Sequence, residues 1–183
     1  MDVTIQERIF SFTSEYDISA PDASYYARKA YFSFTDKLQL QAAESRILAR
    51  IDGYFSPLRR KHDFSIVNNG RVYKFWCEKI WKQVYVCEGN HETFRLYTHK
   101  GLKYSIFKDD RQIAAYVKNR LVFGKGNKYE IRMDSDADLI VILCIVLTMN
   151  SSEESSDNDA SVTIDLGSLG PEDRPFDDSW DPR

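Results

Sequence analysis

The sequence predicts a mainly β protein, a closed twelve-stranded antiparallel β-barrel around a central hydrophobic C-terminal α-helix. Two observations lead to this fold class. Alternating apolar and polar residues, broken at short intervals by turn residues, form twelve segments between Val3 and Met133. An uninterrupted apolar run then follows from Leu139 to Met149. Because nothing before residue 134 has the periodicity of a long helix, βαβ crossovers are not expected.

The alternating segments indicate strands, since successive side chains of a strand point to opposite faces. From Ile47 to Phe55 the apolar residues keep a period of two, which places Leu48 and Tyr54 on the opposite face. Between two later segments, Asn68-Asn69-Gly70 predicts a tight hairpin in which two successive residues adopt positive φ. Short strands joined by such turns are typical of a sandwich or a barrel.

The apolar run predicts a buried helix over about residues 136–149. It has no polar face before Thr148, and a helix that is apolar on all sides must be buried on all sides. Closing the strands around it also removes the exposed sheet edges. The β-branched residues of the run leave a thirteenth strand as the alternative, but eleven apolar residues are long for a strand. The residues expected to form the core of this helix are Leu139, Ile140, Ile142, Leu143, Val146 and Leu147.

Three aspartates, Asp134, Asp136 and Asp138, precede the run. Their spacing matches positions 1, 3 and 5 of a calcium loop, which also needs a glycine at position 6 and a glutamate at position 12. Leu139 and Ile145 stand at those two places. We therefore interpret the aspartates as helix-capping residues.

The charge pattern divides the chain into a domain over residues 1–150 and an acidic tail over residues 151–183. The first part has 23 basic and 18 acidic residues, a net charge of +5, whereas the tail has ten acidic and two basic residues, a net charge of −8. The tail is rich in Ser, Asp, Glu, Gly and Pro, so we expect it to be disordered and to solubilise the protein. The candidate docking motifs within it are the stretch Val162-Thr163-Ile164-Asp165-Leu166 and the residues Phe176 and Trp180.

No pattern in the sequence indicates catalysis, a metal ion or a cofactor. Cys77, Cys87 and Cys144 fit no metal or disulfide spacing, and the three histidines have no paired spacing. The first eight residues do not resemble a signal peptide, so we expect a cytoplasmic, monomeric protein that is not an enzyme. The apolar run would be about 16 Å long as a helix, too short to cross a hydrocarbon core of about 30 Å.

Three groups of basic residues lie next to predicted strand ends and are candidates for binding an anion or a lipid headgroup. If the barrel brings two groups to one rim, they form a patch suited to phosphate groups. The alternatives are solvated loop charge and intramolecular docking of the acidic tail. The candidate residues are Arg59, Arg60 and Lys61, then Lys118 and Arg120, and finally Lys125 and Lys128.

Several sequence features resemble the LURP-one-related family of the Tubby C-terminal-like superfamily, which includes tubby domains and phospholipid scramblases. They are the paired hairpins closed by aromatic residues, the segment Tyr129-Glu130-Ile131, and Asp136-Ala137-Asp138 ahead of the final apolar run. The aromatic closures are Phe10-Ser11-Phe12, Phe32-Ser33-Phe34 and Phe55-Ser56-Pro57, at spacings of 22 and 23 residues. The resemblance covers roughly residues 3–150 and implies a twelve-stranded barrel threaded by a hydrophobic helix.

This resemblance implies little about activity. Tubby domains bind phosphoinositide headgroups in a basic pocket, and scramblase-like members act at membranes. The tubby phosphoinositide site has no residue-by-residue match in this chain, and the cysteine-rich palmitoylation segment of scramblases is absent from the sequence. Two hypotheses remain: a non-enzymatic barrel that binds anionic phospholipid headgroups or a membrane surface, peripherally at the membrane, and a protein-interaction scaffold regulated by its acidic tail. Nucleic acid is not an expected partner.

Overall fold

A computed structural model describes residues 1–10, 13–29, 37–54, 61–79, 83–120, 126–157 and 173–183. Twelve strands and one helix lie within these ranges. The strands are β1 (Asp2–Phe10), β2 (Thr13–Ser19), β3 (Ser24–Lys29), β4 (Lys37–Ala42), β5 (Ile47–Tyr54), β6 (Lys61–Ile66), β7 (Val72–Lys79), β8 (Val84–Gly89), β9 (Glu92–His99), β10 (Lys103–Lys108), β11 (Arg111–Arg120) and β12 (Asn127–Met133). The helix is α1 (Leu139–Asp157).

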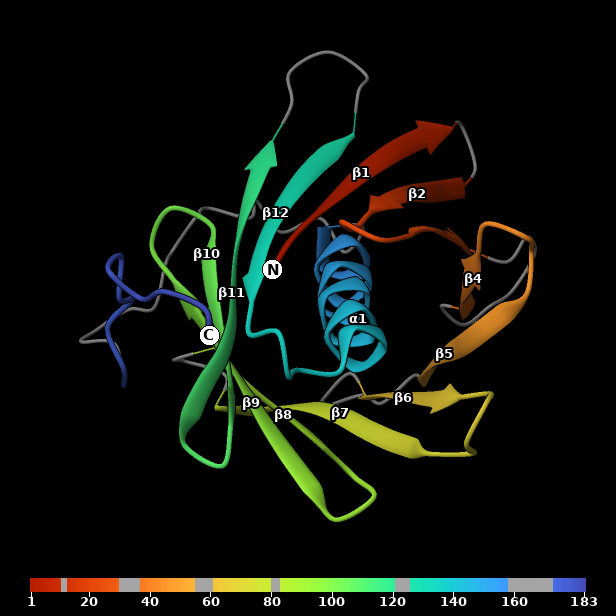
Figure 1. Ribbon diagram of the computed structural model, residues 1–183. Coiled ribbons are helices and arrows are strands. Elements are labelled where there is room, and N and C mark those ends of the chain that lie inside the picture. Colours follow the sequence, from red (N-terminus) through yellow and green to blue (C-terminus); the bar gives the residue numbers. More distant parts are fainter. Residues whose placement is uncertain (11–12, 30–36, 55–60, 80–82, 121–125, 158–172) are drawn as a thin grey trace.

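The strands close into a single antiparallel barrel (Figure 1). Each strand pairs with its neighbours in the sequence, and β1 pairs with β12 to close the sheet, with Val3 opposite Ile131 and Ile5 opposite Tyr129. This is the up-and-down order that consecutive hairpins produce. The predicted closed barrel of twelve strands is confirmed.

Helix α1 lies inside the barrel, as the apolar run predicted (Figure 1). The residues from Val141 to Leu147 are at most 1% exposed, so every side of this stretch is covered by the barrel wall. Ile142, Leu143, Val146 and Leu147 belong to the core cluster, while Leu139 and Ile140 are only partly buried because they form the first turn at the mouth of the barrel.

Both ends of α1 differ from the predicted range of 136–149. The helix begins at Leu139 because Asp138 is its capping residue: Asp138 Oδ1 accepts hydrogen bonds from the backbone amides of Ile140 (3.1 Å) and Val141 (3.3 Å). The capping role expected for Asp138 is therefore confirmed. The helix continues past residue 149 to Asp157, and in this added part Asn150 and Glu153 form hydrogen bonds with side chains of the barrel wall.

Two local features of the sheet differ from the alternation pattern. Tyr54 is exposed as expected, but Leu48 is 5% exposed and belongs to the core. The pairing of β4 with β5 shifts at this point, so that Leu48 is an extra residue between two paired positions, as in a β-bulge. The hairpin between β6 and β7 is present, but Gly70 is the one residue of Asn68-Asn69-Gly70 that has a positive φ.

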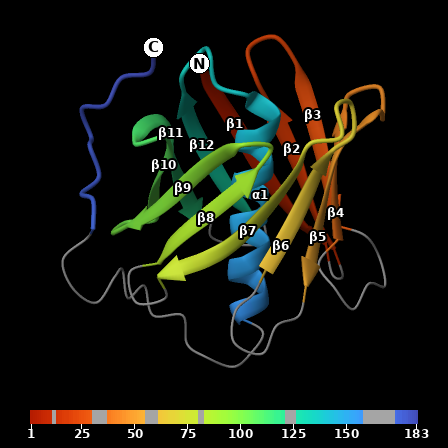
Figure 2. The ribbon, with the colours of Figure 1, turned by 90° about the horizontal axis from the view of Figure 1, so that it is seen from below.

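The two ends of the barrel are distinguished by the direction of α1 (Figure 2). We call the end near Asp138 the start end and the end near Asp157 the exit end. In an up-and-down barrel the odd-numbered strands all run toward one end, and in this chain they run toward the exit end. The last residues of the odd-numbered strands and the first residues of the even-numbered strands therefore all lie at the exit end.

Residues 173–183, which we call the docked segment, lie along the outside of the barrel beside β9–β12 (Figures 1 and 2). They form side-chain contacts with strands β7, β10 and β12. Together with the helical residues 151–157, this differs from the expectation that the whole of 151–183 is disordered. Residues 158–172 of the acidic tail lie outside the described ranges.

Candidate anion-binding end of the barrel

At the exit end, half of the strands have a basic residue as their first or last residue. Six of the twelve strand ends there are Lys or Arg, and none is Asp or Glu. All six are exposed or half-exposed. Since the strands form a closed ring, these residues encircle the end of the barrel from which α1 emerges. The six are Lys29, Lys37, Lys61, Lys79, Lys103 and Arg120.

The start end has a different charge pattern. Its strand ends include two acidic residues, Asp2 and Glu92, and two basic residues, Lys108 and Arg111. Lys108 Nζ lies 2.6 Å from Glu92 Oε1, and Arg111 lies 3.1 Å from Asp136 Oδ2. Burial opposes ionisation of Glu92, but hydrogen bonds from Lys108 and Tyr73 and the nearby positive charges outweigh it and lower its pKa. Basic charge at this end is thus neutralised by adjacent carboxylates.

The structure brings several of the sequence-predicted residues to the exit end. Lys61 is the first residue of β6, Arg120 is the last residue of β11, and Lys128 is the second residue of β12. Lys61 and Arg120 are on different sides of the ring, five strands apart. Lys128 Nζ lies 2.6 Å from Glu130 Oε1, and this hydrogen bond lowers the pKa of Glu130. Arg59, Arg60 and Lys125 lie outside the described residues.

Lys118 differs from the others because its ammonium group points into the barrel. Lys118 is 7% exposed, and its Nζ lies 2.7 Å from Glu153 Oε2 and 2.9 Å from Asn150 Oδ1, both on α1. The reason is its position on β11, where it lies on the same inward face as Ala114 and Tyr116, each two residues apart. Lys118 therefore binds α1 and does not belong to the basic ring, by which we mean the six basic strand ends at the exit end.

A layer of polar side chains surrounds the last turns of α1. Asn150 Nδ2 donates to the hydroxyl of Tyr16 at 2.9 Å, and the hydroxyl of Tyr129 donates to Asn150 Oδ1. The hydroxyl of Tyr104 donates to Glu153 Oε1 at 2.8 Å, and burial together with the charge of Glu153 raises the pKa of Tyr104. These bonds satisfy polar groups that would otherwise be buried without partners.

A second surface, on the outside of the barrel, is covered by the docked segment. Asp173 Oδ2 lies 2.5 Å from Lys79 Nζ, Asp178 Oδ1 lies 2.5 Å from Lys103 Nζ, and Asp181 Oδ1 lies 2.9 Å from Arg132. The hydrogen bond and charge of Asp173 raise the pKa of Lys79. Aromatic contacts add to these pairs. The surface, which we call the tail-binding face, consists of Lys79, Tyr97, His99, Lys103, Phe107 and Arg132.

Burial on the outside of the barrel supports this description. Phe107 and Ala115 are 8% and 7% exposed, yet neither belongs to the core cluster around α1. On β10, Phe107 alternates with the inward-facing Tyr104 and Ile106, so it faces outward. The guanidinium of Arg174 stands 4.2 Å from the centre of its ring. The docked segment therefore covers an apolar part of the outer wall.

Comparison with known families assigns the chain. The model of the LURP-one-related family matches residues 1–150. The chain belongs to the LURP-one-related family. The resemblance identified in the sequence is thereby confirmed, and the barrel with its internal helix is consistent with a relation to the Tubby-like superfamily. No curated protein and no solved structure matches this LURP-one-related chain.

Sequence reasoning missed four members of the basic ring: Lys29, Lys37, Lys79 and Lys103. Lys37, Lys79 and Lys103 stand near predicted strand ends but outside any cluster of basic residues, and Lys29 falls inside a segment that the sequence predicts to end at Phe34. The signal that could have identified them is the hairpin order itself, since every second connection of an up-and-down barrel lies at the same end. Within the described residues, α1 does not have the length and hydropathy of a membrane-crossing helix.

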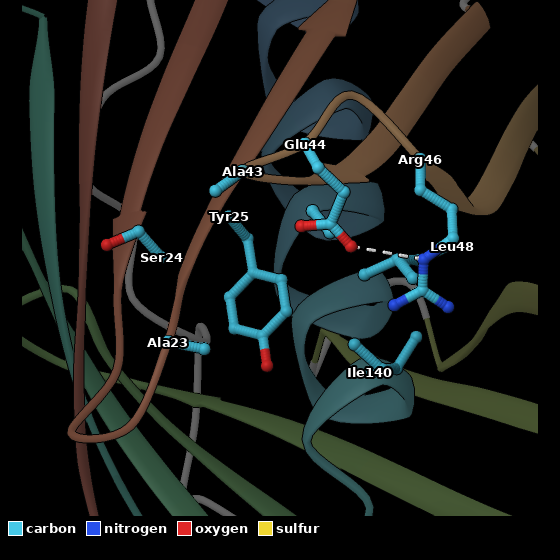
Figure 3. Close-up of a pocket in the computed structure, with 9 residues that line it drawn as sticks. Ala23, Ser24, Tyr25, Ala43, Glu44, Arg46, Leu48 and Ile140 are labelled. Carbon is cyan, nitrogen blue, oxygen red and sulfur yellow. Dashed lines mark hydrogen bonds and ion pairs between the residues drawn. The ribbon is translucent and has the colours of Figure 1, made fainter.

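A cavity of about 390 Å³ opens at the start end, between the barrel wall and the first turn of α1 (Figure 3). Tyr25, Leu48 and Ile140 form its apolar wall, and Arg46 Nε lies 3.2 Å from Glu44 Oε1 at its rim. The cavity is the space left where the partly buried first turn of α1 meets the barrel mouth. Its lining has no nucleophile paired with a base.

Proposed function

We propose that this LURP-one-related chain is a non-enzymatic binding domain that recognises anionic phospholipid headgroups, or an anionic membrane surface, with the exit end of its barrel. The observation that carries the proposal is the difference in charge between the strand ends at the two ends of the barrel. Six strand ends at the exit end are basic, and none is acidic. Membership of the family fits a binding domain and leaves its ligand open.

The basic ring has the geometry for a flat anionic surface. The six residues lie around the end of the barrel where α1 leaves it. They can therefore contact a flat membrane at the same time when the barrel axis is perpendicular to that membrane. Each Lys or Arg near an anionic membrane contributes about 1 kcal/mol, and the attraction falls off within about 10 Å at 0.1 M salt. Binding should therefore be reversible and weakened by salt. Under this proposal the protein is a cytoplasmic monomer at the membrane periphery, without a nucleic-acid ligand.

Vesicle co-sedimentation of the full chain tests the proposal. The wild-type chain should sediment with vesicles that contain phosphatidylserine and phosphatidylcholine and remain in solution with phosphatidylcholine alone. The variant Lys61→Glu/Arg120→Glu should bind at least about 30-fold more weakly, because two attractive charges of about 1 kcal/mol each are lost and two repulsive charges are added. Lys61 and Arg120 form no salt bridge with another residue of the described ranges, so the substitutions break no such pair.

The matched control is Arg46→Glu/Lys74→Glu. Arg46 follows the turn between β4 and β5 at the start end, and Lys74 is an exposed residue in the start-end half of β7. This variant has the same change in net charge, and it should bind vesicles like the wild type because both substitutions lie away from the exit end. Equal loss of binding in both variants would contradict a site at the exit end.

The second candidate function is a protein-interaction scaffold whose acidic tail regulates access to the barrel. It is favoured by the ion pairs that join Asp173 and Asp178 to two members of the basic ring, Lys79 and Lys103. The full-chain variant Asp173→Asn/Asp178→Asn should bind anionic vesicles up to about 30-fold more tightly, because it exposes two cations of about 1 kcal/mol each. Unchanged vesicle binding would argue against regulation by the tail.

A further inference from the structure

On the tail-binding face, one arginine of the docked segment lies against a pair of aromatic side chains. The guanidinium of Arg174 lies 4.2 Å from the ring centre of Phe107 and 5.5 Å from that of Tyr97. These two rings meet edge to face at 5.4 Å. Arg174 also donates a hydrogen bond of 3.3 Å to the backbone carbonyl of Asp110. Contact of the cation with two rings together with a hydrogen bond from the guanidinium favours arginine over lysine at this position.

A second position of the face holds an aromatic ring. Phe176 meets the ring of His99 at 5.2 Å, and Lys103 Nζ lies 4.9 Å from the centre of Phe176. His99 is 6% exposed, and its Nε2 lies 2.7 Å from Ser105 Oγ, so the ring that supports Phe176 is fixed by the barrel. At this position the ring of Phe176 therefore contacts the fixed ring of His99 on one side and the ammonium group of Lys103 on another.

Acidic residues follow the aromatic ring in the docked segment. Lys103 binds Asp178, and further along the segment Arg132 binds Asp181. The contacts made by residues 174, 176 and 178 are spaced by two residues, the spacing at which an extended chain presents side chains to one surface. Pro175 restricts φ between the first two contacts and so reduces the entropy lost on docking.

We propose that the tail-binding face is a docking site for a linear peptide segment of a partner protein. The segment carries an arginine, an aromatic residue two positions later and acidic residues after it. The chain's own residues 173–183 have this pattern and act as a tethered competitor for the same face. This site goes beyond the membrane-binding function proposed above, since it lies on the outer wall of the barrel and would recognise a peptide by the order of its side chains.

The tether sets how the two ligands compete. Fifteen residues connect Asp157 to Asp173 in the sequence, so the docked segment remains on the same chain when it leaves the face. A ligand tethered in this way competes at an effective concentration on the order of millimolar. If the docked segment itself binds the face with a Kd of about 0.1 mM or tighter, a partner peptide must bind the wild-type chain at least about tenfold more weakly than it binds the open face.

A trans-peptide experiment on the full chain tests this proposal. The probe is a fluorescent synthetic peptide with the sequence of residues 173–183, measured by anisotropy. The variant Arg174→Ala/Phe176→Ala/Asp178→Asn opens the face, and the probe should bind it at least tenfold more tightly than it binds the wild type. Adding Lys103→Glu to the open variant should abolish this binding, whereas adding Lys74→Glu should leave it unchanged.

Two controls separate specific docking from other outcomes. A second probe with alanine in place of its arginine and phenylalanine should not bind the open variant, and thermal melting should show that all chain variants remain folded. Equal binding of the first probe to the wild type and the open variant would overturn the proposal. Concentration-dependent dimerisation of the wild type would also overturn it, because the face would then belong to a second copy of the chain.

Discussion

A single lysine shows why residue type and position near a strand end do not predict a role. Its position in the sequence places Lys118 with Arg120, two residues later on β11, but Lys118 points inward and binds Glu153 of α1 at 2.7 Å. Removing one member of a buried ion pair leaves the other charge without compensation. The alternation phase on β11 was the relevant signal, and Tyr116 and Ala114 share it.

Substitution of this pair should have a non-additive effect on stability. Glu153→Gln should lower the free energy of unfolding by about 3 kcal/mol, the low end for buried pairs, because the side chain of Glu153 is 30% exposed. Lys118→Met should cost a similar amount. The double variant should recover most of the loss, since neither charge is then left alone. Urea unfolding of the four chains measures this, and strictly additive losses would contradict the account.

Helix α1 shows which parts of an element its sequence predicts. The burial of its apolar stretch follows from the absence of a polar face, and the structure confirms it. The extension to Asp157 could not be predicted, because Asn150 and Glu153 are polar residues whose partners Tyr16, Tyr104 and Lys118 are contributed by distant strands. Leu48 is a similar case, since the bulge that turns it inward depends on how β4 pairs with β5.

The start of α1 gives a prediction at the same scale. Asp138→Ala should destabilise the protein by about 1 kcal/mol through loss of the N-cap, and slightly more because Arg71 loses one of its two carboxylate partners among the described residues. Asp136→Ala is the matched control, as the exposed Asp136 contributes only a surface pair with Arg111 and should cost less than about 0.5 kcal/mol. The melting temperature of Asp138→Ala should therefore fall further below that of the wild type than the melting temperature of Asp136→Ala. Equal decreases in the two variants would contradict a capping role for Asp138.

At the scale of the whole molecule, the order of the hairpins places the basic strand ends mostly at one end of the barrel, so the charge is distributed unevenly although the net charge is small. The sequence indicated a basic domain and an acidic tail, and it identified Lys61 and Arg120 near strand ends. The six-membered ring could not be recognised from clusters alone, because its members are spread over more than ninety residues and meet only when the barrel closes. Docking of residues 173–183 depends on outward-facing residues of several strands, which alternation does not distinguish from solvent-exposed ones.

Backbone hydrogen exchange of the full chain, with and without phosphatidylserine-containing vesicles, tests the central claim most directly. If the exit end contacts the membrane, the vesicles should slow exchange in peptides that contain the strand ends at Lys29, Lys61 and Arg120. Peptides that contain the start-end turns near Arg46 and Asp110 should not change. Protection confined to the start end, or no protection at either end, would contradict the assignment of the basic ring as the binding surface.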